Sequence, residues 1–145
     1  MKRILLVALA ATLASVSAFA ATPAGLWKTI DDNTGKARGL IRVTNVNGEF
    51  KGTIEKLYQA HDEDQDPKCD KCDGELRNKP VIGMTILTGL RQDGDDYENG
   101  KILDPESGRV YSSRAILDET GKKLEVRGYI GVSLIGRSQT WIRAD

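Results

Sequence analysis

The residues that first suggest chemistry are two cysteines, Cys69 and Cys72, the only ones in the chain. Their spacing is that of a redox motif and also of half a zinc site. A redox dithiol needs a helix N-terminus or a similar setting to lower the thiol pKa, whereas this pair has acidic neighbours and β-prone surroundings. A structural zinc ion needs four ligands, and the nearest addition is His61 with carboxylates. We therefore predict a local disulfide, with a metal site as the alternative.

An acidic run next to the cysteines raises the question of calcium. Asp62, Asp64 and Asp66 are spaced two residues apart, as at the start of a calcium-binding loop. The run then departs from that pattern, because Pro67 stands where the turn needs glycine and Asp73 stands where a bidentate glutamate is usual. The pattern favours a solvated acidic loop, and weak calcium binding by the three aspartates is the alternative.

Catalytic groups are sparse. His61 is the only histidine, so Ser-His-Asp and Cys-His chemistry would depend on it alone. The chain has neither a glycine-rich phosphate loop nor a His-Glu-x-x-His helix. Glu125, Asp104 and Glu106 could pair as acid and base, but residues of this kind mostly form turns or lie on solvated strand faces. We therefore expect a protein that is not an enzyme and needs no cofactor.

A polar set near the C-terminus is more suggestive of binding. Strand alternation places Arg127 and Tyr129 on one side of a segment, and Arg137, Gln139 and Trp141 on one side of the next. If these sides face a cavity, the four polar residues Arg127, Tyr129, Arg137 and Gln139 could orient a ligand. If they face solvent, they are ordinary surface residues. The interior position is favoured for Trp141 and the surface position for Arg127.

The elements that must position these residues are strands. No segment after Pro23 keeps an apolar stripe at helical spacing over ten residues. Asn47-Gly48 between two β-prone runs predicts a hairpin, since both residues tolerate positive φ. Other turns are predicted at Asp93-Gly94, at 104–108 and at 118–121. The strands expected in the second half of the chain are 96–103, 109–117, 122–130 and 135–143.

These strands predict an all-β fold, a small antiparallel up-and-down barrel. A meander of seven or eight strands has two exposed edges unless it closes, and closure removes them. An open sandwich is the competing arrangement. Residues 59–80 interrupt the strand rhythm and are predicted to form one long loop containing the cysteines, while three glycines from Gly128 to Gly136 predict a sharp bend before the last strand.

The N-terminus has the features of a secretion signal. Lys2 and Arg3 precede an apolar run, and small residues lead to Ala20, after which cleavage is expected. Residues 1–20 are thus predicted to be a signal peptide, and 21–145 a single periplasmic domain without a membrane span. The 21 basic residues include Lys2 and Arg3, so 19 remain against 21 acidic ones. This weakly acidic balance gives no indication of nucleic-acid binding.

The two ends of the domain suggest how the barrel closes. Gly25-Leu26-Trp27 near the start and Trp141-Ile142-Arg143 at the end allow the Trp27 indole to close the base, with the guanidinium of Arg143, or alternatively Arg137, stacked on it. A Gly-x-Trp opening resembles the lipocalin and wider calycin pattern.

A larger set of motifs in the same order resembles one bacterial secreted family, domain of unknown function 2147. The motifs are Gly25-Leu26-Trp27, Cys69-x-x-Cys72, Gly83-Met84-x-Ile86-Leu87, Gly100-Lys101-Ile102-Leu103-Asp104-Pro105-Glu106, Leu124-x-Val126-Arg127-Gly128-Tyr129 and Gly136-Arg137-x-Gln139-Thr140-Trp141. The resemblance implies a periplasmic, lipocalin-like barrel whose biochemical role is unassigned.

The function predicted from all this is binding of a small apolar or amphipathic molecule inside the barrel. The alternative is a structural or interaction module that contacts a protein of the cell envelope. In that alternative side chains fill the interior, as an eight-stranded barrel allows.

Overall fold

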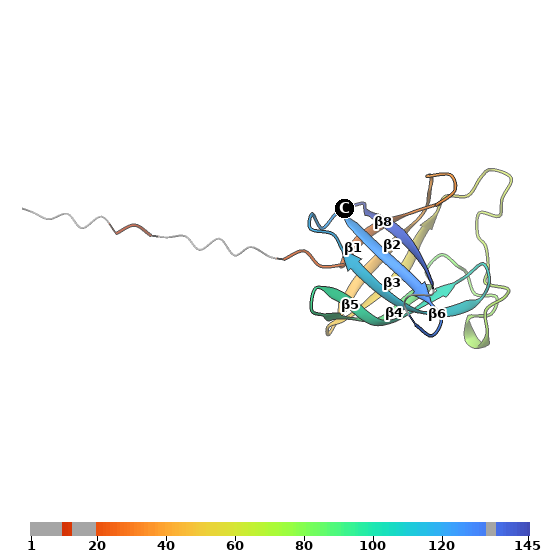
Figure 1. Ribbon diagram of the computed structural model, residues 1–145. Helices are drawn as coiled ribbons and strands as arrows, with labels where there is room; N and C mark the ends of the chain where they lie inside the picture. Colours follow the sequence, from red (N-terminus) through yellow and green to blue (C-terminus); the bar gives the residue numbers. More distant parts are fainter. Residues whose placement is uncertain (1–9, 13–19, 133–135) are drawn as a thin grey trace, which may run out of the picture.

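The computed structural model describes residues 10–12, 20–132 and 136–145, and within these ranges eight antiparallel strands close into a barrel (Figure 1). Each strand pairs with the next, and the last returns to the first. The predicted all-β, up-and-down barrel is confirmed, and the open sandwich is wrong. The strands are β1 (Gly25–Ile30), β2 (Ala37–Val46), β3 (Glu49–Leu57), β4 (Thr85–Asp93), β5 (Asp96–Asp104), β6 (Arg109–Leu117), β7 (Lys123–Tyr129) and β8 (Gly136–Arg143).

The turns follow the chemistry of their residues. Asn47 and Gly48 join β2 to β3 with φ of 54° and 86°, the paired positive values that a two-residue hairpin requires. The predicted hairpin is therefore confirmed. The predicted strand 109–117 has the observed bounds, and the predicted strand ends at 122, 130 and 135 each differ by one residue from those of β7 and β8.

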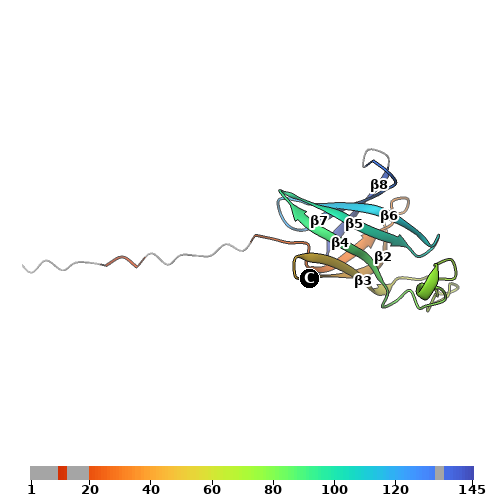
Figure 2. The ribbon, with the colours of Figure 1, turned by 90° about the horizontal axis from the view of Figure 1, so that it is seen from below.

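A long loop separates β3 from β4 and contains the short 3-10 helix η1 (Gly74–Leu76). It projects at the end of the barrel opposite the C-terminus and opposite the point where the N-terminal segment leaves (Figures 1 and 2). Most of the expected signal peptide, and residues 133–135 of the expected bend, lie outside the described residues. Within the described part, no helix is long and apolar enough to cross a membrane.

Inward-facing apolar side chains fill the lower half of the barrel, the end with the hairpin at Asn47 and Gly48. Phe50 and Tyr97 pack edge to face there, with ring centroids 5.3 Å apart. Leu90 and Leu124 beside them are fully buried. Each such leucine contributes about 1.5–3 kcal/mol of transfer free energy, so this half holds the ring together.

Trp27 closes the base. It is fully buried, and its indole N–H donates to the carbonyl of Pro23 over 2.8 Å. Trp27 pairs with Arg143 across the contact of β1 with β8, and the Arg143 guanidinium lies 4.4 Å from the centre of the indole ring. A Cβ atom at Gly25 would lie 2.4 Å from Arg143 Nη1, where φ is also +144°. Glycine at this position therefore allows the arginine to approach.

Candidate functional site

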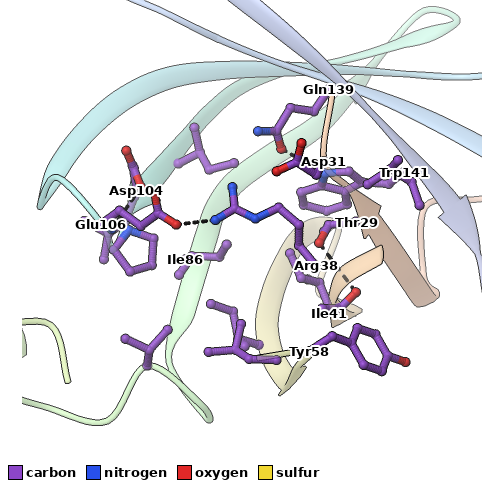
Figure 3. A pocket seen from close by; sticks show the side chains of 18 of the residues that line it. Thr29, Asp31, Arg38, Ile41, Tyr58, Ile86, Asp104, Glu106, Gln139 and Trp141 are labelled. Carbon is purple, nitrogen blue, oxygen red and sulfur yellow. Dashed lines mark hydrogen bonds and ion pairs between the residues drawn. The ribbon is translucent and has the colours of Figure 1, made fainter. Parts of the chain in front are cut away.

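The upper half of the barrel holds a cavity of about 1390 Å³, open between the loops (Figure 3). Small-molecule pockets usually measure about 300–1,000 Å³, so there is room for a ligand of substantial size. The side chains therefore leave space inside the upper half of the barrel, whereas they fill the lower half. Apolar side chains from six strands line the cavity wall: Ile41, Ile54, Ile86, Ile102, Val126 and Trp141.

Small residues on inward positions keep this space open. Gly128 lies on the cavity side of β7, and a Cβ atom built there would meet Ile102 and Tyr111 only at 3.5 and 3.6 Å. No large side chain occupies that position, in contrast to the buried Leu124 lower on the same strand. The change from large to small residues along β7 thus separates the packed base from the hollow top.

A few polar groups interrupt the apolar wall. The Trp141 indole N–H donates to Gln139 Oε1 over 3.5 Å, a long and weak contact. Thr29, from β1, faces the same part of the cavity, with its hydroxyl 3.5 Å from the carbonyl of Gly39. Tyr111 adds a phenol from β6. An apolar cavity with few polar groups is typical of sites that bind apolar or amphipathic molecules.

The mouth of the cavity is charged but balanced. Of the described residues that line it, five are basic and five acidic, and they are Lys36, Arg38, Lys56, Lys68, Arg137, Asp31, Glu63, Asp70, Asp104 and Glu106. Arg38 forms an ion pair with Glu106, and Arg137 forms one of 3.1 Å with Asp32. Backbone N–H groups of Thr34 and Asn33 donate to the Asp31 carboxylate and lower its pKa below the ordinary range. The mouth therefore carries little net charge.

Most of the predicted ligand-orienting residues lie at this cavity. Tyr129 and Gln139 are half-buried in its lining, and Arg137 stands at the exposed rim. Arg127 is not among the lining residues. It pairs with Ser138 in the register of β7 with β8 and donates to the Ser138 hydroxyl over 2.9 Å, on the face away from Val126 and Gln139.

The predicted closing residues occupy two levels of the barrel. Trp27 and Arg143 are at the base, whereas Trp141 is buried in the cavity wall and pairs with Thr29. Arg137, the alternative partner for Trp27, is at the opposite end of β8 from Arg143 and lies at the mouth.

The cysteine loop forms one side of the mouth. Cys69 and Cys72 are joined by the predicted disulfide and both are buried, with the sulfur of Cys69 3.4 Å from the carbonyl of Pro105. Pro67, Lys68 and Asp70 of this loop line the cavity. The disulfide therefore fixes a loop that shapes the entrance.

The three aspartates proposed for calcium do not gather around a common point. Asp64 accepts a hydrogen bond from the backbone N–H of Asp66, and Asp66 pairs with Lys68 at 2.7 Å. Among the described residues, no group of three or more histidine, cysteine or acidic side chains could hold a metal ion.

Of the carboxylates considered for catalysis, Asp104 and Glu106 lie in one turn at the mouth, and Glu125 lies away from them on the outer face of β7. Asp104 accepts hydrogen bonds from the backbone of Glu106 and the hydroxyl of Ser107, which shape the turn at the mouth. Glu125 is exposed on the strand face opposite Val126 and is absent from the lining.

Sequence reasoning missed Arg38. Simple alternation from the buried Gly39 and Ile41 would put Arg38 on the outer face of β2, yet its guanidinium reaches the turn between β5 and β6. No local signal could have found this contact, because the partner is 68 residues away in the sequence.

A closed ring of eight antiparallel strands, with a tryptophan–arginine base and a cavity open at one end, defines the protein as a lipocalin-like barrel. The chain belongs to the family described as "uncharacterized protein conserved in bacteria", DUF2147, which it matches over residues 25–143. A similar solved structure is protein HP1028 from Helicobacter pylori, described as belonging to the lipocalin family. It has a TM-score of 0.73 and 21% identity, covering 87% of this chain and 85% of that one. None of the curated proteins matches the chain in sequence.

Proposed function

We propose that the mature protein is a periplasmic binding protein that holds one small apolar or amphipathic molecule inside the barrel. The observation that carries the proposal is the cavity of about 1390 Å³ with its wall of isoleucine, valine and tryptophan side chains. Burial of apolar ligand surface against such a wall yields about 25 cal/mol per Å². The proposal is one of binding rather than catalysis, because the chemistry of the wall offers contact surface and few ionisable groups.

Titration with the neutral fluorescent probe N-phenyl-1-naphthylamine tests this function. We expect one probe per protein, with enhanced emission in the apolar cavity. The variant Gly128→Leu should weaken binding by about tenfold or more while the protein stays folded, because its Cβ meets Ile102 and Tyr111 only at ordinary van der Waals distance and Gly128 lines the cavity. Glu125→Leu is the matched control on the outer face of the same strand, and it should bind like the parent.

Failure of the parent to bind the probe, or equal binding by Gly128→Leu and the parent, would contradict the proposal. Fluorescence of the two tryptophans provides an independent measurement. Trp141 lines the cavity and should respond to the ligand, whereas Trp27 lies outside the lining.

The periplasmic part of the proposal depends on removal of residues 1–20. The observation that supports it is the order of a basic start, an apolar run and small residues before Ala21. Intact-mass measurement of the protein recovered from the periplasmic fraction should give a chain that begins at Ala21. Recovery of the uncleaved chain from the cytoplasm would contradict it.

A further inference from the structure

Arg38 spans the mouth of the cavity. It belongs to β2, and its ion-pair partner Glu106 lies on the turn between β5 and β6. In a closed ring in which consecutive strands are neighbours, β2 and β6 lie on opposite sides. Figure 3 shows the Arg38 side chain extended between Glu106 and the group formed by Trp141 and Gln139. The guanidinium therefore lies among the residues that line the cavity, within reach of the polar end of a bound amphiphile.

This ion pair can be exchanged. The side chains of Arg38 and Glu106 are 50% and 72% exposed, and a pair so accessible to water adds little to stability. The turn between β5 and β6 does not depend on the Glu106 carboxylate. It is held by the backbone N–H of Glu106 and by the Ser107 hydroxyl, which both donate to the Asp104 carboxylate. An incoming anion could thus replace the Glu106 carboxylate without unfolding the entrance.

Most of the other charged side chains at the mouth already have a partner. Arg137 pairs with Asp32, Lys68 pairs with Asp66, and the Lys56 ammonium lies 5.1 Å from the centre of the Tyr58 ring. The acids Asp31 and Glu63 accept hydrogen bonds from nearby backbone N–H groups, while Lys36 and Asp70 add one charge of each sign at the rim. Because the positive and negative charges at the mouth balance, discrimination between ligand head groups has to come from a contact with one particular side chain.

We infer that the cavity selects amphiphiles with an anionic head group, which takes the place of Glu106 on the Arg38 guanidinium. The inference rests on the proposed function and names the ligand class of the same site. A guanidinium offers two parallel N–H donors that match a carboxylate or phosphate. The apolar tail lies against Ile41, Ile86 and Trp141 of the cavity wall. Glu106 acts as an internal competitor that occupies Arg38 when the cavity is empty.

Calorimetric titration with dodecanoate, dodecyl phosphate and 1-dodecanol, each below its aggregation concentration, tests the inference. The parent should bind one or both anions about tenfold more tightly than the alcohol, the gain typical of a charge-assisted hydrogen bond. Arg38→Gln should remove that preference, because it weakens binding of the anions about tenfold more than binding of the alcohol. Glu106→Gln should tighten anion binding, because the competing carboxylate is gone.

A matched control pair includes an arginine of the same strand: Arg42 is on β2, like Arg38, and its partner Glu55 is on β3. Arg42 pairs with Glu55 at 2.8 Å, both side chains are partly exposed to solvent, and neither residue lines the cavity. Arg42→Gln and Glu55→Gln should therefore leave all three affinities as in the parent.

The outcomes separate the two proposals. Binding of the alcohol and the anions with equal affinity, unchanged in Arg38→Gln, would overturn the inference and leave the binding function standing. Absence of binding of all three compounds to the parent would overturn the binding function itself. A preference for dodecyl phosphate or for dodecanoate supports the inference and identifies the head group.

Discussion

At the scale of single residues, Arg143 makes several distinct contacts at the base of the barrel. Its guanidinium stacks on Trp27 and donates to three backbone carbonyls, those of Gly121, Ala24 and Thr22, over 2.6, 2.9 and 2.7 Å. These carbonyls belong to the segment before β1 and to the turn before β7. One side chain thus ties three separate parts of the chain at the base.

Arg143→Lys tests this role. Lysine keeps the positive charge but loses the planar fork that reaches several carbonyls at once and stacks on the ring. We expect a loss of about 2 kcal/mol in the free energy of unfolding, measured in urea. The same change at Arg42, whose side chain is partly exposed and pairs with Glu55, should cost clearly less. Equal costs at the two positions would contradict the role assigned to Arg143.

Asp118 gives the protein an acid-sensitive turn. Its carboxylate accepts hydrogen bonds from the backbone N–H groups of Lys123 and Lys122 and from the hydroxyl of Thr120. The bond from the Lys123 N–H is the largest cause that lowers its pKa below the ordinary 3.8. A lowered pKa in the folded state means that folding favours the ionised carboxylate. This stabilisation is complete above the unfolded pKa and is lost as pH falls through the folded one.

The variant Asp118→Asn should therefore melt at a lower temperature than the parent at neutral pH. The difference should shrink as the pH falls below about 3.8 and through the lowered pKa of the folded protein. Thermal unfolding followed by circular dichroism at several pH values measures this. Glu119→Gln, a neighbouring carboxylate that takes no part in these hydrogen bonds, is the control. A difference between Asp118→Asn and the parent that does not depend on pH would contradict the assignment.

At the scale of elements, the long loop after β3 and the turn after β5 depend on each other. Gly108 ends the turn with φ of +73°, and a Cβ atom there would lie 1.9 Å from the backbone oxygen of Lys71. Lys71 lies within the disulfide-closed ring, and Cys69 packs on Pro105 of the turn. This close backbone contact fixes the loop against the turn that presents Glu106 to Arg38.

Gly108→Ala should displace the loop. It introduces both a strained left-handed alanine, which costs about 1–2 kcal/mol, and a clash with backbone that cannot move aside easily. Gly94→Ala isolates the first effect, since Gly94 has φ of +64° with no atom near the Cβ position. We expect Gly108→Ala to lose more stability in urea than Gly94→Ala and to be cleaved faster by trypsin in the loop. Similar losses for both would mean that the contact with Lys71 contributes nothing.

At the scale of the whole molecule, the sequence predicts the ring better than its interior. Closure was predictable because Trp27 and Arg143 stand near the two ends of the domain, and the turns predicted at 104–108 and 118–121 located β6 to the residue. The size of the cavity could not be predicted, because it depends on side chains from all the strands together. Nor could the ion pair of Arg38 with Glu106, since register irregularities between Thr29 and Ile30 and between Leu40 and Ile41 change how β1 and β2 meet their neighbours.

The pairing of β1 with β8, which closes the barrel, covers few residues, and this predicts where the barrel opens. Among the described residues, β1 and β8 pair over Trp27–Thr29 and Trp141–Arg143, whereas β2 and β3 pair from Gly39 and Leu57 to Val46 and Glu49. Local opening follows the least supported backbone pairing. In native-state hydrogen exchange, we therefore expect the amides of β1 and β8 at this contact to exchange faster than those of β2 and β3.

Ligand and mutation should move this exchange in opposite directions. Thr29 and Trp141 are partners across the contact and both line the cavity, so a bound amphiphile touches both strands and should slow exchange there. Arg143→Lys, which loosens the base, should accelerate it by about tenfold or more for a loss of roughly 2 kcal/mol. If the amides of all eight strands instead exchange at one rate in the parent and the variant, the ring opens as a single cooperative unit, and the contact of β1 with β8 is no weaker than the rest.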